Sequence, residues 1–127
     1  MVAYALGERA GLPARNFLFV CSQNKLRSPT AEHIFADVKG IHTLSAGTNS
    51  DAPEPLSDEL VEWADFIFVM EAIHRNKLRK RHRRALKDQR VIVLNIPDEY
   101  EYMDPALVAR LEHAMARWLP MERASTS

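Results

Sequence analysis

The chain has 127 residues, of which 46% are hydrophobic and 27% charged, and its 17 Lys and Arg residues balance its 17 Asp and Glu residues. This composition is typical of a soluble protein with one domain, and zero net charge argues against binding to polyanions through overall charge. Cys21 is the only cysteine, which excludes an internal disulfide, and no apolar run approaches the roughly 20 residues that span a membrane. We therefore expect a cytoplasmic protein that makes no membrane contact.

One α/β domain is expected between two short chain ends. Residues 1–15 contain no long apolar segment and are predicted to be an extension, not a signal peptide. Residues 16–119 hold the segments with apolar periodicity and are predicted to form the domain. Residues 120–127 are expected to be a frayed tail.

Within this domain, strands and helices are expected to alternate in chain order. Short apolar runs predict strands at 16–20, 41–46, 66–70 and 91–96. Helices are predicted at 30–38 with Ser28 as cap, after a Ser57 cap, from Glu71 with Ile73, Leu78 and Leu86 as apolar anchors, and from Asp104-Pro105 to Leu119. Because no tight hairpin turn interrupts the alternation, we expect an α/β fold: a four-stranded parallel sheet with helices on both faces, a flavodoxin-like three-layer sandwich.

A thiol and a guanidinium stand together where the first predicted strand meets the first predicted helix, in the segment Cys21-Ser-Gln-Asn-Lys-Leu-Arg27. Backbone N–H groups of such a loop and the N-terminus of the helix attract a tetrahedral oxyanion, and an arginine fork grips two oxygens at once. The thiolate that this positive field favours is the nucleophilic form of cysteine. The segment therefore predicts an enzyme that reacts covalently with phosphate. The plainer interpretation is a buried structural cysteine with a surface arginine nearby by chance.

Two carboxylates are expected at the same edge of the sheet as Cys21. Glu71 follows the third predicted strand, and Asp98 follows the fourth. The carboxyl ends of parallel strands meet at one edge, where ligands of such folds bind. Glu71 either orients the phosphate loop or simply begins a helix, and the sequence leaves both interpretations open.

The segment FVCSQNKLRSPTAE resembles the phosphate-binding loop of the low-molecular-weight protein tyrosine phosphatases. Its Cys-x5-Arg-Ser motif runs from Cys21 to Ser28, with the internal asparagine of the family at Asn24. SAGT at 45–48, ADFIFVME at 64–71 and an aspartate in LNIPDEY follow in the order of the family. The similarity extends from residue 16 to residue 119.

This resemblance implies a phosphomonoester hydrolase that acts on phosphotyrosine proteins or small phosphomonoesters and needs no metal or organic cofactor. It implies that Cys21 is the nucleophile that forms a cysteinyl-phosphate, that Arg27 binds the phosphoryl oxygens, and that Asp98 is the general acid. The implied phosphate-binding residues are Ser22, Gln23, Asn24, Lys25, Leu26, Arg27 and Ser28. The implied supporting residues are Ser45, Glu71 and Tyr100. In this arrangement Ser28 bonds to the Cys21 sulfur, and Ser45 helps Asn24 to hold the loop.

Two aspartates compete for the role of general acid. Asp104 is followed by proline, as the acid of the family is, whereas Asp98 has the expected position just after the last strand. Placing the acid at Asp98 matches Tyr100 to an aromatic residue of the family and leaves Asp104-Pro105 as an ordinary helix start. We favour Asp98.

The sequence departs from the family pattern at three places, and two of them, Gln23 and the shortened segment before the third strand, motivate an alternative function. Gln23 stands where glycine is usual, Leu26 stands where many members have a second cysteine, and the segment between SAGT and the third strand is short. Without a second thiol, Cys21 has no internal partner that protects it from oxidation. The alternative is a non-catalytic phosphate- or polyanion-binding module of the same fold.

The segment 74–87, HRNKLRKRHRRALK, holds eight of the 17 Lys and Arg residues. The simpler interpretation is a solvated helix face, and the functional one is a binding surface for nucleic acid or an acidic partner. The segment has no Phe, Tyr or Trp for base stacking, which counts against single-stranded nucleic acid. Its histidines, His74 and His82, are expected to have no carboxylate or cysteine partners, so no metal site is expected.

Overall fold

A computed structural model describes residues 14–120, so the predicted extension and tail lie almost entirely outside the described residues. The elements in chain order are β1 (Arg15–Cys21), α2 (Arg27–Phe35), β2 (Ile41–Gly47), α3 (Asp58–Trp63), β3 (Phe66–Val69), α4 (Ala72–Arg81), β4 (Arg90–Val93) and α5 (Pro105–Met115). Strands and helices therefore alternate as the sequence predicts, and β1 begins at Arg15, inside the expected extension.

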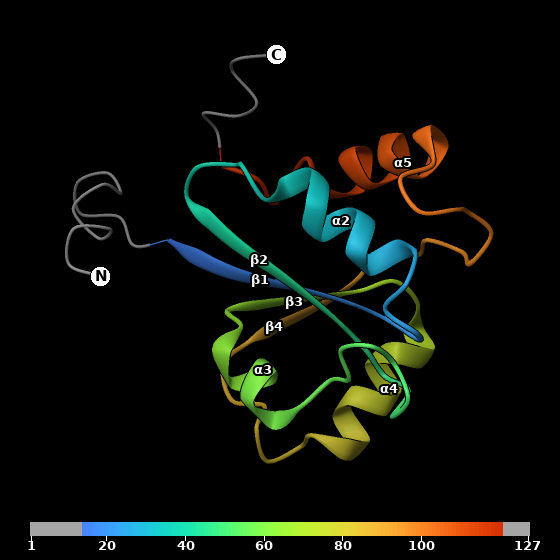
Figure 1. Cartoon of the computed structure of the whole chain (residues 1–127). Helices are drawn as coiled ribbons and strands as arrows, with labels where there is room; N and C mark the ends of the chain where they lie inside the picture. Colours follow the sequence, from blue (N-terminus) through green and yellow to red (C-terminus); the bar gives the residue numbers. More distant parts are fainter. Residues whose placement is uncertain (1–13, 121–127) are drawn as a thin grey trace.

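The strands form one parallel sheet in the order β2-β1-β3-β4. Helices α2 and α5 cover one face of this sheet, and α3 and α4 cover the other (Figure 1). The predicted α/β sandwich with a four-stranded parallel sheet is confirmed. Crossovers through helices explain the parallel order, because a tight turn can only join antiparallel strands.

The central strand β1 is buried on both faces, and its side chains alternate between two cores. Phe17, Phe19 and Cys21 point to the core under α2 and α5. Leu18 and Val20 point to the core under α3 and α4. This alternation follows from the two-residue period of a strand and explains why the run is apolar without interruption.

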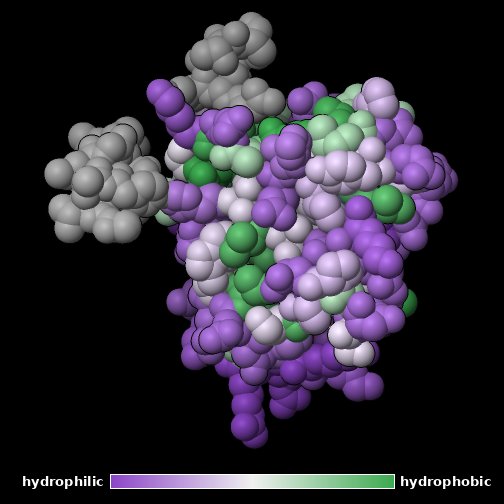
Figure 2. Space-filling model, viewed as in Figure 1, coloured by the Kyte–Doolittle hydropathy of each residue, from purple (hydrophilic) through white to green (hydrophobic). Residues whose placement is uncertain are grey.

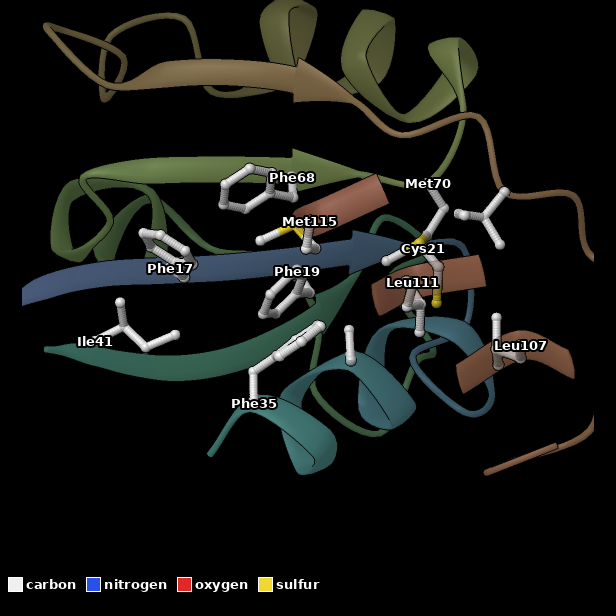
Figure 3. Close-up of a cluster of buried hydrophobic side chains, with 12 residues drawn as sticks. Phe17, Phe19, Cys21, Phe35, Ile41, Phe68, Met70, Leu107, Leu111 and Met115 are labelled. Carbon is white, nitrogen blue, oxygen red and sulfur yellow. The ribbon is translucent and has the colours of Figure 1, made fainter. Parts of the chain in front are cut away.

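The order of the strands reverses direction at β1. The chain moves from β1 to β2 on one side and then crosses to β3 on the other side. A crevice forms at the carboxyl ends of the strands at such a point, and ligands of α/β proteins bind there. Cys21 is the last residue of β1 and therefore stands at this crevice; Figure 3 shows it at the tip of the strand, near Met70 and Leu111.

The start of α2 differs from the sequence prediction. The helix begins at Arg27, and no side chain caps it, so the prediction of Ser28 as the N-cap is wrong. The Ser28 hydroxyl instead lies 2.9 Å from the Cys21 sulfur. Pro29 is accommodated in the first turn because the N–H groups there have no partner within the helix.

Of the three apolar anchors expected on α4, Leu78 is buried as predicted, and Ile73 and Leu86 differ. Ile73 is 53% exposed, and Leu86 lies beyond the helix, which ends at Arg81. The side chains that α4 buries are His74 and Leu78, which stand one turn apart. A buried histidine therefore takes the place that the sequence suggests for an aliphatic residue. Among the described residues, no helix is long and apolar enough to cross a membrane.

Candidate active site

The Cys21 thiol is held at the carboxyl end of β1 by the loop that follows it. The side chain of Ser28 places its Oγ 2.9 Å from the Cys21 Sγ, and the backbone N–H of Asn24 donates to the same sulfur at 3.3 Å. Cys21 is free of disulfide bonds and only 3% exposed. Two polar groups thus point at the sulfur from the helix side and the loop side, an arrangement that stabilises a sulfur carrying negative charge.

Asn24 fixes the shape of this loop. Its backbone has φ 58°, in the left-handed region that few residues other than glycine and asparagine adopt. Its side-chain amide donates to Ser28 Oγ at 3.0 Å and to Ser45 Oγ at 2.9 Å. The hydroxyl of Ser45 in turn donates to Glu32 on α2 at 2.5 Å. The expected contact between Ser45 and Asn24 is therefore present, and the loop turn is anchored to both β2 and α2.

Gly47 lets the end of β2 approach the loop closely. A Cβ atom at this position would stand 2.6 Å from the Ser22 carbonyl oxygen and 3.0 Å from the Asn24 amide nitrogen. The N–H of Thr48 donates to the Cys21 carbonyl at 2.9 Å, and the N–H of Asn49 donates to the Ser22 carbonyl at 3.0 Å. The backbone of residues 47–49 thus packs directly against Cys21, Ser22 and Asn24.

Arg27 follows this loop as the first residue of α2 and is only 2% exposed. Its Nη1 donates to the Ile96 carbonyl at 2.8 Å and lies 3.3 Å from the Glu71 carboxylate. Its Nε lies 3.8 Å from the Asp98 carboxylate. A buried guanidinium requires compensating partners, and two carboxylates and a carbonyl supply them here.

The two aspartates that compete in the sequence have different environments. Asp98 lies beside Arg27, and its side chain is 62% exposed. Asp104 caps α5, where its Oδ1 accepts the backbone N–H of Ala106 at 2.9 Å. The loop between them is tied to α2, because the Met103 N–H donates to the Thr30 hydroxyl at 3.0 Å. The structure therefore brings Asp98 to the arginine and uses Asp104 as a helix cap.

Glu71 takes both of the parts that the sequence leaves open. It is the N-cap of α4, and it forms a capping box with His74, in which each side chain contacts the backbone of the other residue. Its carboxylate also reaches Arg27. A helix cap and an arginine partner are thus combined in one side chain, which links the start of α4 to the residue that follows the loop of residues 22–26.

His74 is a site residue that the sequence prediction missed. Its Nδ1 accepts the Glu71 backbone N–H at 3.0 Å, so its proton must be on Nε2, which lies 2.9 Å from the Ser22 Oγ. Burial, and next the nearby Arg27 guanidinium, lower the pKa of His74 from 6.5 to about 4. The side chain is therefore a neutral imidazole that donates to the loop. Its place within a run of cations hides this role in the sequence.

The remaining predicted residues are less closely tied to the sulfur. Lys25 is exposed, and Ser22, Gln23 and Leu26 are half-buried along the loop. The predicted supporting residue Tyr100 is half-buried against the α2–α5 core, with its hydroxyl 3.5 Å from Arg110. Among residues 14–120, no group of three His, Cys, Asp or Glu side chains is arranged to hold a metal ion.

A second hollow lies at the opposite edge of the sheet. It has a volume of about 600 Å³, and Arg15, Asp65 and Arg90 are among its lining residues. These residues stand at the amino ends of strands, and the hollow includes none of the predicted site residues. Its lining contains both acidic and basic side chains, so it has no net positive charge that would favour an anion. The chemically useful groups gather at the other edge, around Cys21.

Comparison with solved structures finds the same fold in several phosphatases. No protein-family model matches the chain, and no curated protein matches it in sequence. A low-molecular-weight protein tyrosine phosphatase from Streptococcus pyogenes, SP-PTP, superposes with a TM-score of 0.70 at 14% identity, over 88% of this chain and 98% of that chain. The YwlE arginine phosphatase from Geobacillus stearothermophilus gives 0.67 at 23% identity, over 88% and 94%. Wzb from Vibrio vulnificus, solved with benzylphosphonate, gives 0.66 at 22% identity, over 83% and 97%. The predicted low-molecular-weight phosphatase fold is confirmed over most of the chain.

Proposed function

We propose that this chain is a phosphomonoester hydrolase that acts through a cysteinyl-phosphate intermediate on Cys21. The observation that carries the proposal is the sulfur held by Ser28 at 2.9 Å and by the Asn24 N–H at 3.3 Å, on a loop that ends at the buried Arg27. The phosphatases that share the fold support the reaction class. Phosphorylated proteins and small phosphomonoesters are the proposed substrates.

In the first step, the Cys21 thiolate attacks the phosphorus atom of the ester. The bond between phosphorus and the leaving oxygen breaks as the phosphorus–sulfur bond forms, and Asp98 donates its proton to the departing alkoxide or phenoxide. Asp98 is suited to this role because its carboxylate is exposed and lies 3.8 Å from the Arg27 Nε. It can therefore reach a leaving group that extends from the loop toward solvent.

In the second step, a water molecule attacks the phosphorus of the cysteinyl-phosphate. Asp98, now ionised, accepts a proton from this water, and the phosphorus–sulfur bond breaks to return the thiolate and release inorganic phosphate. The Ser28 hydroxyl donates to the departing sulfur, which stabilises the thiolate as it leaves. Protons and electrons balance over the two steps without a metal or an organic cofactor.

The phosphoryl oxygens are bound by the loop and by Arg27. The backbone amides of residues 22–27 surround the anion, and the guanidinium donates through Nε and Nη2. Its Nη1 is already committed to the Ile96 carbonyl and to Glu71, which fixes the plane of the fork. Donors held in place before the reaction cost no reorganisation when charge builds up on the transferring group.

We also propose that the reaction takes place in the cytoplasm. The nucleophile is a free thiol, and the described chain has no second cysteine that could protect it as a disulfide. A reducing compartment keeps such a thiol active.

Hydrolysis of 4-nitrophenyl phosphate and phenyl phosphate tests the proposal. Cys21→Ser should abolish both activities while the protein stays folded. Asp98→Asn should reduce kcat about 100-fold or more for phenyl phosphate, and less for 4-nitrophenyl phosphate, whose leaving group needs less help from an acid. A purely structural role for Asp98 would lower both rates by the same factor.

Asp104→Asn is the matched control. Asparagine caps helices as well as aspartate does, so this variant should keep both activities within about twofold. If Asp104→Asn, and not Asp98→Asn, shows the dependence on the leaving group, the assignment of the acid is wrong. A folded wild-type protein that binds phosphate but hydrolyses neither ester would refute the hydrolase and favour the anion-binding module.

A further inference from the structure

Helix α4 and the turn after it carry a row of exposed cations. The exposed members are Arg79, Lys80, Arg81, Arg83, Arg84 and Lys87, and Arg75 and Lys77 are half-buried. Figure 2 shows strongly hydrophilic side chains over the lower end of the molecule, where Figure 1 places α4. Arg75, Arg79, Lys80, Arg83 and Arg84 are called the basic surface below.

The charges of the basic surface are not cancelled by nearby acids. Within residues 14–120, the acidic side chain in salt-bridge contact with this segment is Asp58, which bonds to His82 at 2.7 Å. The five members of the basic surface form no salt bridge within the described residues. Their positive potential is therefore directed to solvent and is open to an anionic partner.

The helix that carries most of the basic surface contacts the loop around Cys21. At the start of α4, Glu71 contacts Arg27 and His74 contacts Ser22. At the end of α4, the Arg81 Nη1 donates to the Thr48 carbonyl at 2.8 Å. The start of the helix is thus fixed to the loop of residues 22–27 and its end to Thr48, and the cations of the basic surface lie at exposed or half-buried positions of α4 and the turn after it.

We propose that the basic surface binds an acidic polypeptide segment that carries the phosphoryl group to Cys21. The proposal rests on the function proposed above and names its substrate class: phosphoproteins with Asp or Glu residues on one side of the phosphorylated residue. The path from Glu71 to Arg81 is about 15 Å long at 1.5 Å per helical residue, and an extended peptide covers it in about five residues at 3.3 Å each. The acids are therefore expected about two to five residues from the phosphorylated residue.

Three features favour a polypeptide over nucleic acid. The whole chain has zero net charge, so no long-range field draws it to a polyanion. The segment 72–89 contains no Phe, Tyr or Trp on which a base could stack. Ile73, 53% exposed at the start of α4, offers an apolar contact for a side chain next to the phosphorylated residue. A short row of cations beside an apolar residue suits an acidic peptide.

Two phosphotyrosine peptides of equal length, one with Asp and Glu at these positions and one with Asn and Gln, test the proposal. In wild-type protein at low salt, kcat/KM should be about tenfold higher for the acidic peptide, and the ratio should fall as salt screens the charges. Arg79→Glu with Arg83→Glu should remove the preference and leave hydrolysis of 4-nitrophenyl phosphate unchanged. Arg15→Glu with Lys39→Glu is the matched control, since it changes net charge equally at exposed sites near the opposite edge of the sheet.

Binding of the same peptides to the Cys21→Ser protein, followed by fluorescence anisotropy, separates this proposal from the hydrolase. The acidic peptide should bind about tenfold more tightly, and the basic-surface variant should lose the difference even if the protein has no catalytic activity. Equal affinity for the two peptides, or an equal loss in the control variant, would overturn the proposal. Single-stranded RNA that displaces the acidic peptide and binds more tightly would also overturn it, in favour of a nucleic-acid surface.

Discussion

Lowering the pH should destabilise the folded protein through His74. This side chain is fully buried, and its Nδ1 accepts the Glu71 backbone N–H, so the folded protein has no place for a second proton. Protonation would place a proton on Nδ1 against the Glu71 N–H, which is also a donor, and would break the capping box of α4. It would also leave a positively charged imidazolium near the Arg27 guanidinium. The folded structure therefore holds the neutral imidazole and resists its protonation.

The size and sign of this effect follow from the pKa of His74. In the folded protein the pKa is lowered from 6.5 to about 4, first by burial and then by the Arg27 guanidinium. Between these values the unfolded chain binds a proton that the folded chain does not, so the free energy of unfolding falls as pH decreases. A difference of this size corresponds to about 3 kcal/mol when both states are protonated, at about 1.4 kcal/mol per pH unit within the window. That is a large part of the 5–15 kcal/mol typical of a small domain, as an order of magnitude.

Urea denaturation at pH 7, 6, 5 and 4.5 measures this loss. Wild type and His74→Gln should both unfold cooperatively, and the gap between their free energies of unfolding should shrink toward pH 4.5. His113→Gln, which replaces an exposed histidine on α5, is the control and should keep the pH dependence of wild type. A gap between wild type and His74→Gln that stays constant from pH 7 to pH 4.5 would refute the tautomer and the buried neutral state.

Substitutions at three positions, Gly47, Asn24 and Thr48, test the loop. Gly47→Ala should cost about 1–3 kcal/mol in urea denaturation and lower kcat at least tenfold, because its Cβ meets the backbone of Ser22 and Asn24. Asn24→Ala should be about 1 kcal/mol less stable than Asn24→Gly, since both lose the side-chain bonds but only glycine tolerates φ 58°; equal stability would argue against strain. Thr48→Val should be neutral or stabilising by about 1 kcal/mol, because the Thr48 hydroxyl is buried without a partner in the described structure. Thr30→Val, which removes a hydroxyl with two hydrogen bonds, should destabilise in the same assay.

The sheet is the part of the fold that sequence predicts well. β1 is an unbroken apolar run because it is covered on both faces, and β3, which pairs with it in the structure, shows the same pattern. The starts of the helices are less predictable, because a side chain that looks like a cap can be claimed by another group. Ser28 is such a case: its hydroxyl bonds to the sulfur of Cys21 and to the amide of Asn24, and these contacts come from loop closure across the fold.

In the site, too, contacts within a short segment can be predicted from sequence, whereas contacts between distant segments cannot. Cys21 and Arg27 are joined by a short loop, so their approach can be inferred from spacing alone. The choice between Asp98 and Asp104 depends on where a long loop turns, and the sequence supports it only through the resemblance to a family. The position of Asp98 beside Arg27 depends on β4 and on the Met103–Thr30 hydrogen bond, which no local pattern encodes.

Helix α4 explains why a basic segment can conceal a buried site residue. His74 and Leu78 lie one turn apart on its inner face, and Arg79 and Lys80 lie on its outer face. Composition averages over both faces, so the segment looks uniformly charged. On the inner face His74 bonds to Ser22, whereas the outer cations make no salt bridge to the rest of the described protein. Substitutions on the two faces should therefore have independent effects. Reversing outer charges should then change the choice of peptide without changing the pH dependence of stability, whereas His74→Gln should change that dependence and keep the peptide preference.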